Sequence, residues 1–423
     1  PPPPPLFFFH PPDGIGEAQE SRGLGDVYKR QTYGVYAVRH AHLEAYELIL
    51  IGTAMELAIF ITEVPTGIIA DRYTRKGSIL IGLLVMSVSI AIVGLSPTFA
   101  GIGLGMFSWG IGYSFISGAQ EAWLSDEVGE TKANKAFIKG AQWQMTGGVL
   151  SIIPSIILAG IKPHLPFITA AVLYVLLMFL LLVRMSEKGF VRSTNKVKGS
   201  LSVLPEGFWS RLKANHLMVI GIVTSICIAV TMETSMRFMP HVMLNLQDMP
   251  NIPFLNDFTF NASNGAEFSE LGWFGIIEGG GYLAALLGTL IVGKLVNTER
   301  LISISRALTF LTLLASLSAL VFGTANGFLI ALFSYWLLIA LEESMYPIRI
   351  AFVNRGVQSS ERATLISIIN QATSFGEMST GPIMATVSVI KSVPFALIAS
   401  AGASVFASFL FAKSSFPSNE KEG

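Results

Sequence analysis

The sequence lacks several features that mark the large classes of soluble protein. It has a single cysteine, Cys227, among 423 residues, which excludes a disulfide framework and any cysteine-rich metal site. Charged residues make up 13% of the chain, about half of the roughly 25% found in soluble domains. The 28 basic residues are balanced by 28 acidic ones, whereas a nucleic-acid-binding surface needs a clustered basic excess. We therefore expect no nucleic-acid partner and no soluble globule.

Groupings typical of catalysis or metal binding are also missing. The six histidines are scattered, and the closest pair, His40 and His42, lies where a helix should enter a membrane. Glycine runs at 101–105 and 279–281 lie within apolar stretches without a Walker lysine, so close helix packing explains them better than phosphate binding. We predict no catalytic residue, no metal site and no cofactor, and hence a protein that is not an enzyme.

Long apolar runs dominate what is present. Hydrophobic residues account for 52% of the chain, mean hydropathy is +0.59, and the runs reach the roughly 20 residues that cross a bilayer. They are too long and too little alternating for barrel strands, so we predict an all-α membrane protein. The eleven predicted spans are 43–69, 77–95, 98–124, 136–160, 165–184, 216–244, 271–294, 302–322, 327–349, 363–389 and 393–412.

The distribution of basic residues predicts an orientation. If the loop at 71–76 is cytoplasmic, 21 of the 28 Lys and Arg residues lie on that side, and the opposite loops hold three, Arg39, Lys162 and Lys391. The leader holds three more, and Arg237 lies within a span. The alternation follows the positive-inside rule throughout. It predicts a multi-pass protein of the bacterial inner (plasma) membrane with a cytoplasmic C-terminus.

Residues 67–76 read GIIADRYTRK and join the first two spans. They resemble the loop signature G-x-x-x-D-R-x-x-R-R/K of the major facilitator superfamily (MFS). The resemblance implies a two-bundle, twelve-helix carrier in which this loop locks the two halves in one conformation and releases them during the cycle. It implies a gating motif, in which Gly67 lets helices approach closely, formed by Gly67, Asp71, Arg72, Arg75 and Lys76. The alternative is an ordinary positive-inside cluster.

The same resemblance implies that the rest of the chain is divided into two related halves. Residues 293–297 faintly repeat the pattern of 67–71, as expected for two related halves. Five spans precede the long central connection and six follow it, so we predict that 11 of 12 transmembrane helices are present and that the first is missing. The predicted division is 1–31, a non-native leader that resembles translated adaptor sequence; 32–184, an N-terminal bundle (helices 2–6); 185–215, a cytoplasmic linker; 216–412, a C-terminal bundle (helices 7–12); and 413–423, a cytoplasmic tail.

Features of drug/proton antiporters are only partly present. The span at 98–124 has no arginine, and 147–148 offers two glycines in place of the longer G-x-x-x-G-P-x-x-G-G run. A Gly376-x-x-x-x-Gly381-Pro382 stretch occurs in a different helix. The sequence therefore allows drug efflux by proton antiport but does not contain the motifs typical of such antiporters.

Ionisable residues inside the spans are functional candidates, because they are costly in lipid unless they face a cavity or a partner. Glu56 and Glu377 fall near the middles of their spans, where a protonated carboxyl is favoured, and are the leading coupling candidates. Glu233 and Arg237 are spaced i, i+4 and could form an internal ion pair or contact substrate. The remaining candidates are Glu278 and Glu342.

These features together predict a secondary active transporter. We expect a monomer in the lipid bilayer that moves a small organic solute or drug by alternating access, coupled to H⁺ or another ion. The alternative is a non-transporting sensor or scaffold of the same fold, which would gain nothing from membrane-buried glutamates.

Overall fold

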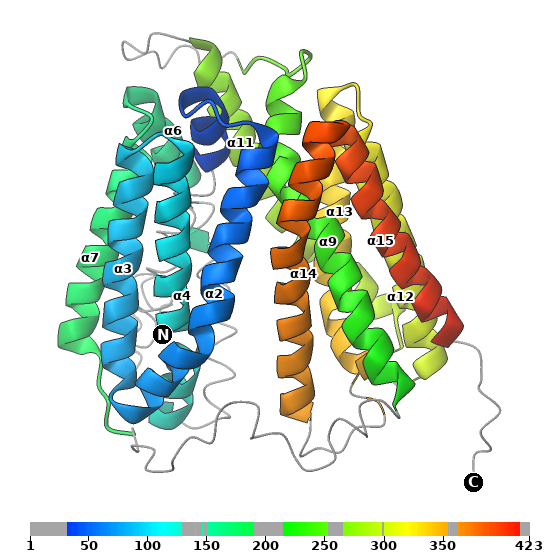
Figure 1. Cartoon of the computed structure of the whole chain (residues 1–423), viewed down its shortest axis with the longest axis horizontal. Coiled ribbons are helices and arrows are strands. Elements are labelled where there is room, and N and C mark those ends of the chain that lie inside the picture. The colour runs from blue at the N-terminus through cyan, green and yellow to red at the C-terminus, as the bar shows by residue number, and fades with distance from the viewer. Residues whose placement is uncertain are drawn as a thin grey trace, which may run out of the picture. The chain divides into compact units, whose positions relative to one another are not determined.

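The computed structural model describes residues 32–128, 140, 146–147, 150–189, 215–252, 265–297, 300–353, 355 and 362–414, and every regular element among them is helical (Figure 1). The predicted leader 1–31 and most of the predicted linker 185–215 lie outside these residues. The helices are η1 (Tyr36–His40), α2 (Ala45–Arg72), α3 (Arg75–Leu95), α4 (Phe99–Val128), α6 (Ile152–Ile161), α7 (Leu165–Arg184), α9 (His216–Asn245), α11 (Gly265–Leu295), α12 (Leu301–Gly323), α13 (Phe328–Val353), α14 (Arg362–Ile390) and α15 (Val393–Ser414).

The predicted all-α membrane fold is confirmed. Each of the eleven predicted spans overlaps one α-helix of the described chain, and nine of these helices are long and apolar enough to cross a membrane. The short α6 covers only the end of the predicted span 136–160. Helix α14 is long enough but more polar, because it carries Asn370, Gln371 and Glu377. The missing first helix stays a prediction.

Side-chain exposure along α12 shows why these helices belong in lipid. Phe310, Leu313 and Leu317 are exposed by 65%, 50% and 54%, while Thr312 and Ser316 are buried. A helix of a soluble protein shows the opposite arrangement, with its apolar stripe facing the core. Small and hydroxyl-bearing residues at helix contacts with apolar residues outside are typical of membrane bundles.

The chain divides into two compact units. Unit 1 comprises Pro1–Tyr33, Ile61–Val197 and Phe260–Ala262, and unit 2 comprises Gly34–Phe60, Lys198–Thr259 and Ser263–Gly423. Helix α2 contributes to both units, since its first part, up to Phe60, groups with the later helices. The predicted bundles 32–184 and 216–412 place this part of α2 differently, and that boundary stays a prediction.

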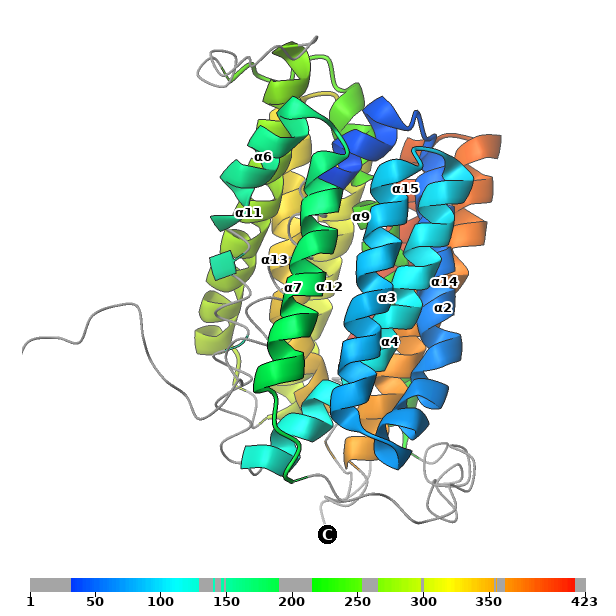
Figure 2. The same cartoon turned by 90° about the vertical axis from the view of Figure 1, so that its left-hand side faces the viewer.

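In unit 1, α3 packs against both α4 and α7, and the three helices lie side by side in Figure 2. A hydrogen bond links the C-terminal part of α2 to α4: the Thr66 hydroxyl donates to the carbonyl oxygen of Ser114 at 2.9 Å. Helix α3 begins at Arg75 because the Thr74 side chain accepts from the Gly77 amide at 3.0 Å, as an N-cap does.

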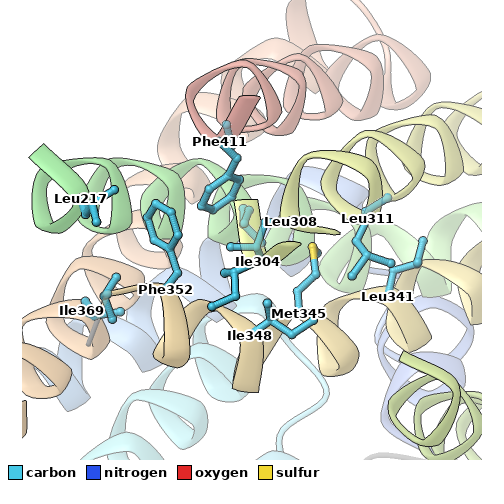
Figure 3. Packing of buried hydrophobic residues seen from close by; sticks show 14 of the residues in the cluster. Leu217, Ile304, Leu308, Leu311, Leu341, Met345, Ile348, Phe352, Ile369 and Phe411 are labelled. Carbon is cyan, nitrogen blue, oxygen red and sulfur yellow. The ribbon is translucent and has the colours of Figure 1, made fainter. Parts of the chain in front are cut away.

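In unit 2, α9 contacts α12, α13, α14 and α15, and α11 packs on α13. The core is apolar and includes Phe352 and Phe411, whose rings meet edge to face at 5.4 Å (Figure 3). Helix α9 starts at His216 because the Asn215 side chain accepts from the amides of Leu217 and Met218. Helices α9 and α14 of this unit carry Arg237 and Glu377.

Asp248, which follows α9 in the chain, caps helix α13. Both carboxylate oxygens of Asp248 accept from the Phe328 amide, at 2.8 and 3.0 Å, where α13 begins. A carboxylate at a helix N-terminus satisfies an otherwise unpaired amide and complements the helix dipole.

Asp248→Ala should lower the free energy of unfolding by about 1 kcal/mol, because the first amide of α13 loses its acceptor. Asp248→Asn keeps an acceptor oxygen and should lose less. Urea unfolding in detergent measures both. The matched control is Gln247→Ala at the exposed neighbouring residue; equal losses in Asp248→Ala and Gln247→Ala would contradict the capping role.

Candidate functional site

A charged cluster of unit 2 is centred on Arg237 of α9. Its Nε donates to the Glu233 carboxylate at 2.6 Å, and its Nη2 lies 3.8 Å from Oε1 of Glu56 on α2. The side chains of Glu233, Glu56 and Arg237 are 8%, 13% and 20% exposed. The i, i+4 ion pair that the sequence allowed is therefore present, and α2 supplies a second carboxylate to the same arginine.

Gly52 makes room for the guanidinium on α2. A Cβ added at this position would overlap the Nε and Cζ atoms of Arg237. The glycine lies one turn before Glu56, so the arginine side chain crosses α2 on the face that carries this carboxylate. The sequence alone gave no signal for this role of Gly52.

Glu377 of α14 is a half-buried fourth member of the cluster. The charges of Glu56, Glu233 and Arg237 are near enough to act on it electrostatically, and Glu342 acts more weakly. Within the part of the chain that the structure describes, its carboxylate has no hydrogen-bonded or ion-paired partner. We name Glu56, Glu233, Arg237 and Glu377 the Arg237 cluster.

Two glycines beside Glu377 bring α14 close to its neighbours. A Cβ on Gly376 would lie 2.9 Å from the carbonyl oxygen of Ile226 on α9, and one on Gly381 would overlap Thr53 on α2. The Gly376–Pro382 stretch, which the sequence left without a function, thus packs α14 against both helices that carry the rest of the cluster.

The other predicted candidates, Glu342 and Glu278, lie on α13 and α11. Glu342 of α13 accepts from Arg349 Nη2 at 2.7 Å, and its second oxygen is buried without a partner among the described residues. Glu343 is exposed, and Glu278 is half-buried on α11. Sequence reasoning missed Arg349 because it lies at the end of a predicted span, next to a loop that was predicted to be cytoplasmic and basic.

The predicted gating motif lies in unit 1, where α2 ends and α3 begins. Arg75 Nη2 is 3.5 Å from Asp71, and Nη1 pairs with Asp126 of α4. Arg75 is 14% exposed and Asp71 57% exposed. Sequence reasoning missed Asp126, because it lies 51 residues from Arg75 along the chain.

The remaining motif residues have different surroundings. Lys76 Nζ donates to the carbonyl oxygens of Leu182 and Met185, both at 2.8 Å, at the C-terminus of α7. Arg72 is exposed. A Cβ on Gly67 would meet no atom within 4 Å, so the close helix approach expected there is not seen among the described residues.

Comparisons with known proteins found a matching family model and two similar transport proteins. The family model of the Major Facilitator Superfamily matches residues 32–259. The "Uncharacterized MFS-type transporter YxaM" of Bacillus subtilis (strain 168) is 26% identical over 344 residues, 80% of each chain. The "Inner membrane transport protein YajR" of Escherichia coli (strain K12) is 30% identical over 203 residues, 44% of each chain.

Solved transporter structures share the fold. A crystal structure of the nucleoside transporter NupG matches with a TM-score of 0.73 at 16% identity, covering 95% of this chain and 98% of that one. A POT family transporter in complex with a thioalcohol-conjugated peptide matches with a TM-score of 0.71 at 15% identity, covering 96% of each chain. At such low identities the similarity shows the fold and does not indicate the substrate.

Proposed function

The chain belongs to the Major Facilitator Superfamily and is a transporter, and on that premise we propose that it moves a small organic solute by alternating access, driven by protons. The Arg237 cluster would bind and release the proton, and the loop at 67–76 would gate the cycle. Family membership also confirms that the chain is not an enzyme.

The observation that carries this proposal is the balance of charge around Glu377. Three carboxylates, Glu56, Glu233 and Glu377, share the neighbourhood of one guanidinium, and Arg237 is already bonded to Glu233. An ionised carboxylate without a partner is costly in a membrane-embedded site. Neutralisation of Glu377 by a proton removes this cost, so its charge can change with the pH on the side to which it opens.

The proposed setting is a multi-pass monomer in a bacterial inner membrane with a cytoplasmic C-terminus. Its support is the positive-inside pattern of the loops and the printed name of the similar Escherichia coli protein, an inner membrane transport protein. Net direction follows the gradients across the membrane, so uptake and efflux are both outcomes of the test below.

The test is flux through the purified full chain in proteoliposomes. Radiolabelled adenosine, alanylalanine and tetraphenylphosphonium sample a neutral, a zwitterionic and a cationic solute, each with and without an imposed pH gradient. Flux of any one that follows the gradient and collapses with a protonophore supports the proposal. If every solute in a wider panel crosses no faster than in protein-free vesicles, the proposed activity is wrong and the sensor alternative gains.

Asp71→Asn should slow the conformational cycle several-fold with little change in KM. The substitution weakens the 3.5 Å contact with Arg75 but leaves the Arg75–Asp126 pair of the same unit, and a gate acts on the rate of interconversion. Initial rates over a range of solute concentrations measure both parameters. A variant with raised KM and an unchanged maximal rate would argue against gating.

A further inference from the structure

The residues that follow α7 form an ordered segment, Met185–Gly189, bound to the start of α3. Glu187 Oε1 accepts from the backbone amides of Arg75 at 2.6 Å and Lys76 at 3.1 Å. Its Oε2 accepts from the Thr74 hydroxyl at 2.6 Å. A single carboxylate thus satisfies two of the orphan amides in the first turn of α3 and fixes the residue that caps it.

The contact is reciprocal, because α3 also caps α7. The ammonium group of Lys76 donates to the last carbonyl groups of α7, at Leu182 and Met185. A cation at a helix C-terminus and an anion at a helix N-terminus both complement the helix dipoles. The two helix ends are therefore joined by Glu187 in one direction and Lys76 in the other.

Helix α4 also binds the segment. Trp123 Nε1 donates to the carbonyl oxygen of Ser186 at 2.7 Å. Glu127 accepts from the Ser186 hydroxyl and the Gly189 amide, both at 2.7 Å. Asp126, between these two α4 residues, is the partner of Arg75. The segment thus contacts both elements whose side chains meet in the Arg75–Asp126 pair.

We propose that Glu187 is a positioning residue of the transport cycle, which holds the first turn of α3 so that Arg75 reaches Asp71 and Asp126. The amide that Glu187 binds belongs to the same residue as the gating guanidinium. Loss of the carboxylate frees the first turn of α3, and the Arg75 side chain then loses its fixed direction toward Asp126. This inference rests on the proposed alternating-access function.

The first measurement is hydrogen exchange of the full chain in lipid nanodiscs. Glu187→Ala should speed exchange of the Arg75 and Lys76 amides about fivefold or more, since a lost cap exposes them to local opening. Glu187→Gln keeps an acceptor oxygen and should recover much of the protection. The matched control is Lys188→Ala, because Lys188 is the exposed neighbour of Glu187. Equal exchange in Glu187→Ala and the wild type would overturn the proposal.

The second measurement separates positioning from local capping. In a Cys227→Ser background, a cysteine introduced by Thr53→Cys reports opening of the contact between α2 and Gly381 of α14 through its rate of labelling by a maleimide. Glu187→Ala should change this rate about threefold or more, since gating residues alter interconversion rates. Gly189→Ala provides a second route, because its Cβ would overlap the Asp126 carbonyl group and push the segment away.

Each outcome decides one question. A labelling rate altered in Glu187→Ala and Gly189→Ala, largely restored in Glu187→Gln and unchanged in Lys188→Ala supports the positioning role. Faster exchange with an unchanged labelling rate makes Glu187 a local helix cap and overturns the inference. Absence of labelling in every variant, including the wild-type background, would instead count against alternating access itself.

Discussion

Glu377→Gln should abolish solute flux driven by a pH gradient and leave solute exchange at equal pH intact. Glutamine has the shape of a protonated glutamate but cannot release a proton, so the coupled step is lost while the neutral form of the cluster is preserved. Counterflow of labelled against unlabelled solute needs no net proton movement and should continue. Flux with and without the gradient, on the same vesicles, measures both.

The control for this prediction is Glu343→Gln, the same substitution at an exposed glutamate of α13. It should leave gradient-driven flux close to that of the wild type. Glu56→Gln should weaken the coupling less than Glu377→Gln does, because Arg237 keeps its 2.6 Å bond to Glu233. Unchanged pH dependence in both Glu56→Gln and Glu377→Gln would remove the cluster as the coupling site.

The sequence predicted the helices well because lipid imposes a simple rule. A spanning segment must satisfy its backbone internally and present apolar side chains outside, so α3 and α12 begin within two residues of the predicted 77 and 302. The described start of α14 likewise falls one residue from the predicted 363. Local composition carries this information, and no tertiary contact is needed to read it.

Partners across the fold could not be predicted in the same way. The Glu233–Arg237 pair was readable because it lies on one helix, whereas the approach of Glu56 to the same arginine depends on how α2 packs on α9. Glu187 lies 112 residues from Arg75, and in the sequence it is one more acid in a polar connection. The depth of a charged residue in a span predicts which residues are functional candidates, but only the packing of the helices shows which of them form ion pairs.

Glycine 52 illustrates the same limit and leads to the second large effect. Gly52→Ala should lower the maximal rate of gradient-driven flux at least about tenfold, because the added Cβ overlaps the Arg237 guanidinium and displaces a buried charged group. A tenfold loss of rate corresponds to about 1.4 kcal/mol, and the displacement costs more than this. The guanidinium would move away from Glu56, whose carboxylate then loses its cation. The measurements are the flux rate at saturating solute and its dependence on the pH gradient.

The structure offers a matched glycine for comparison. Gly402 of α15 is exposed, and a Cβ there would meet no atom within 4 Å, so Gly402→Ala changes the same group in a helix of the same unit without touching Arg237. It should retain near wild-type flux, and if it loses as much as Gly52→Ala, the loss reflects helix substitution in general.

A further variant, Gly52→Ala with Arg237→Lys, tests the cause directly. Lysine keeps the positive charge on a smaller head group. If overlap with the guanidinium stops the cycle, the double variant should recover part of the flux. No recovery would assign the defect to the packing of α2 instead.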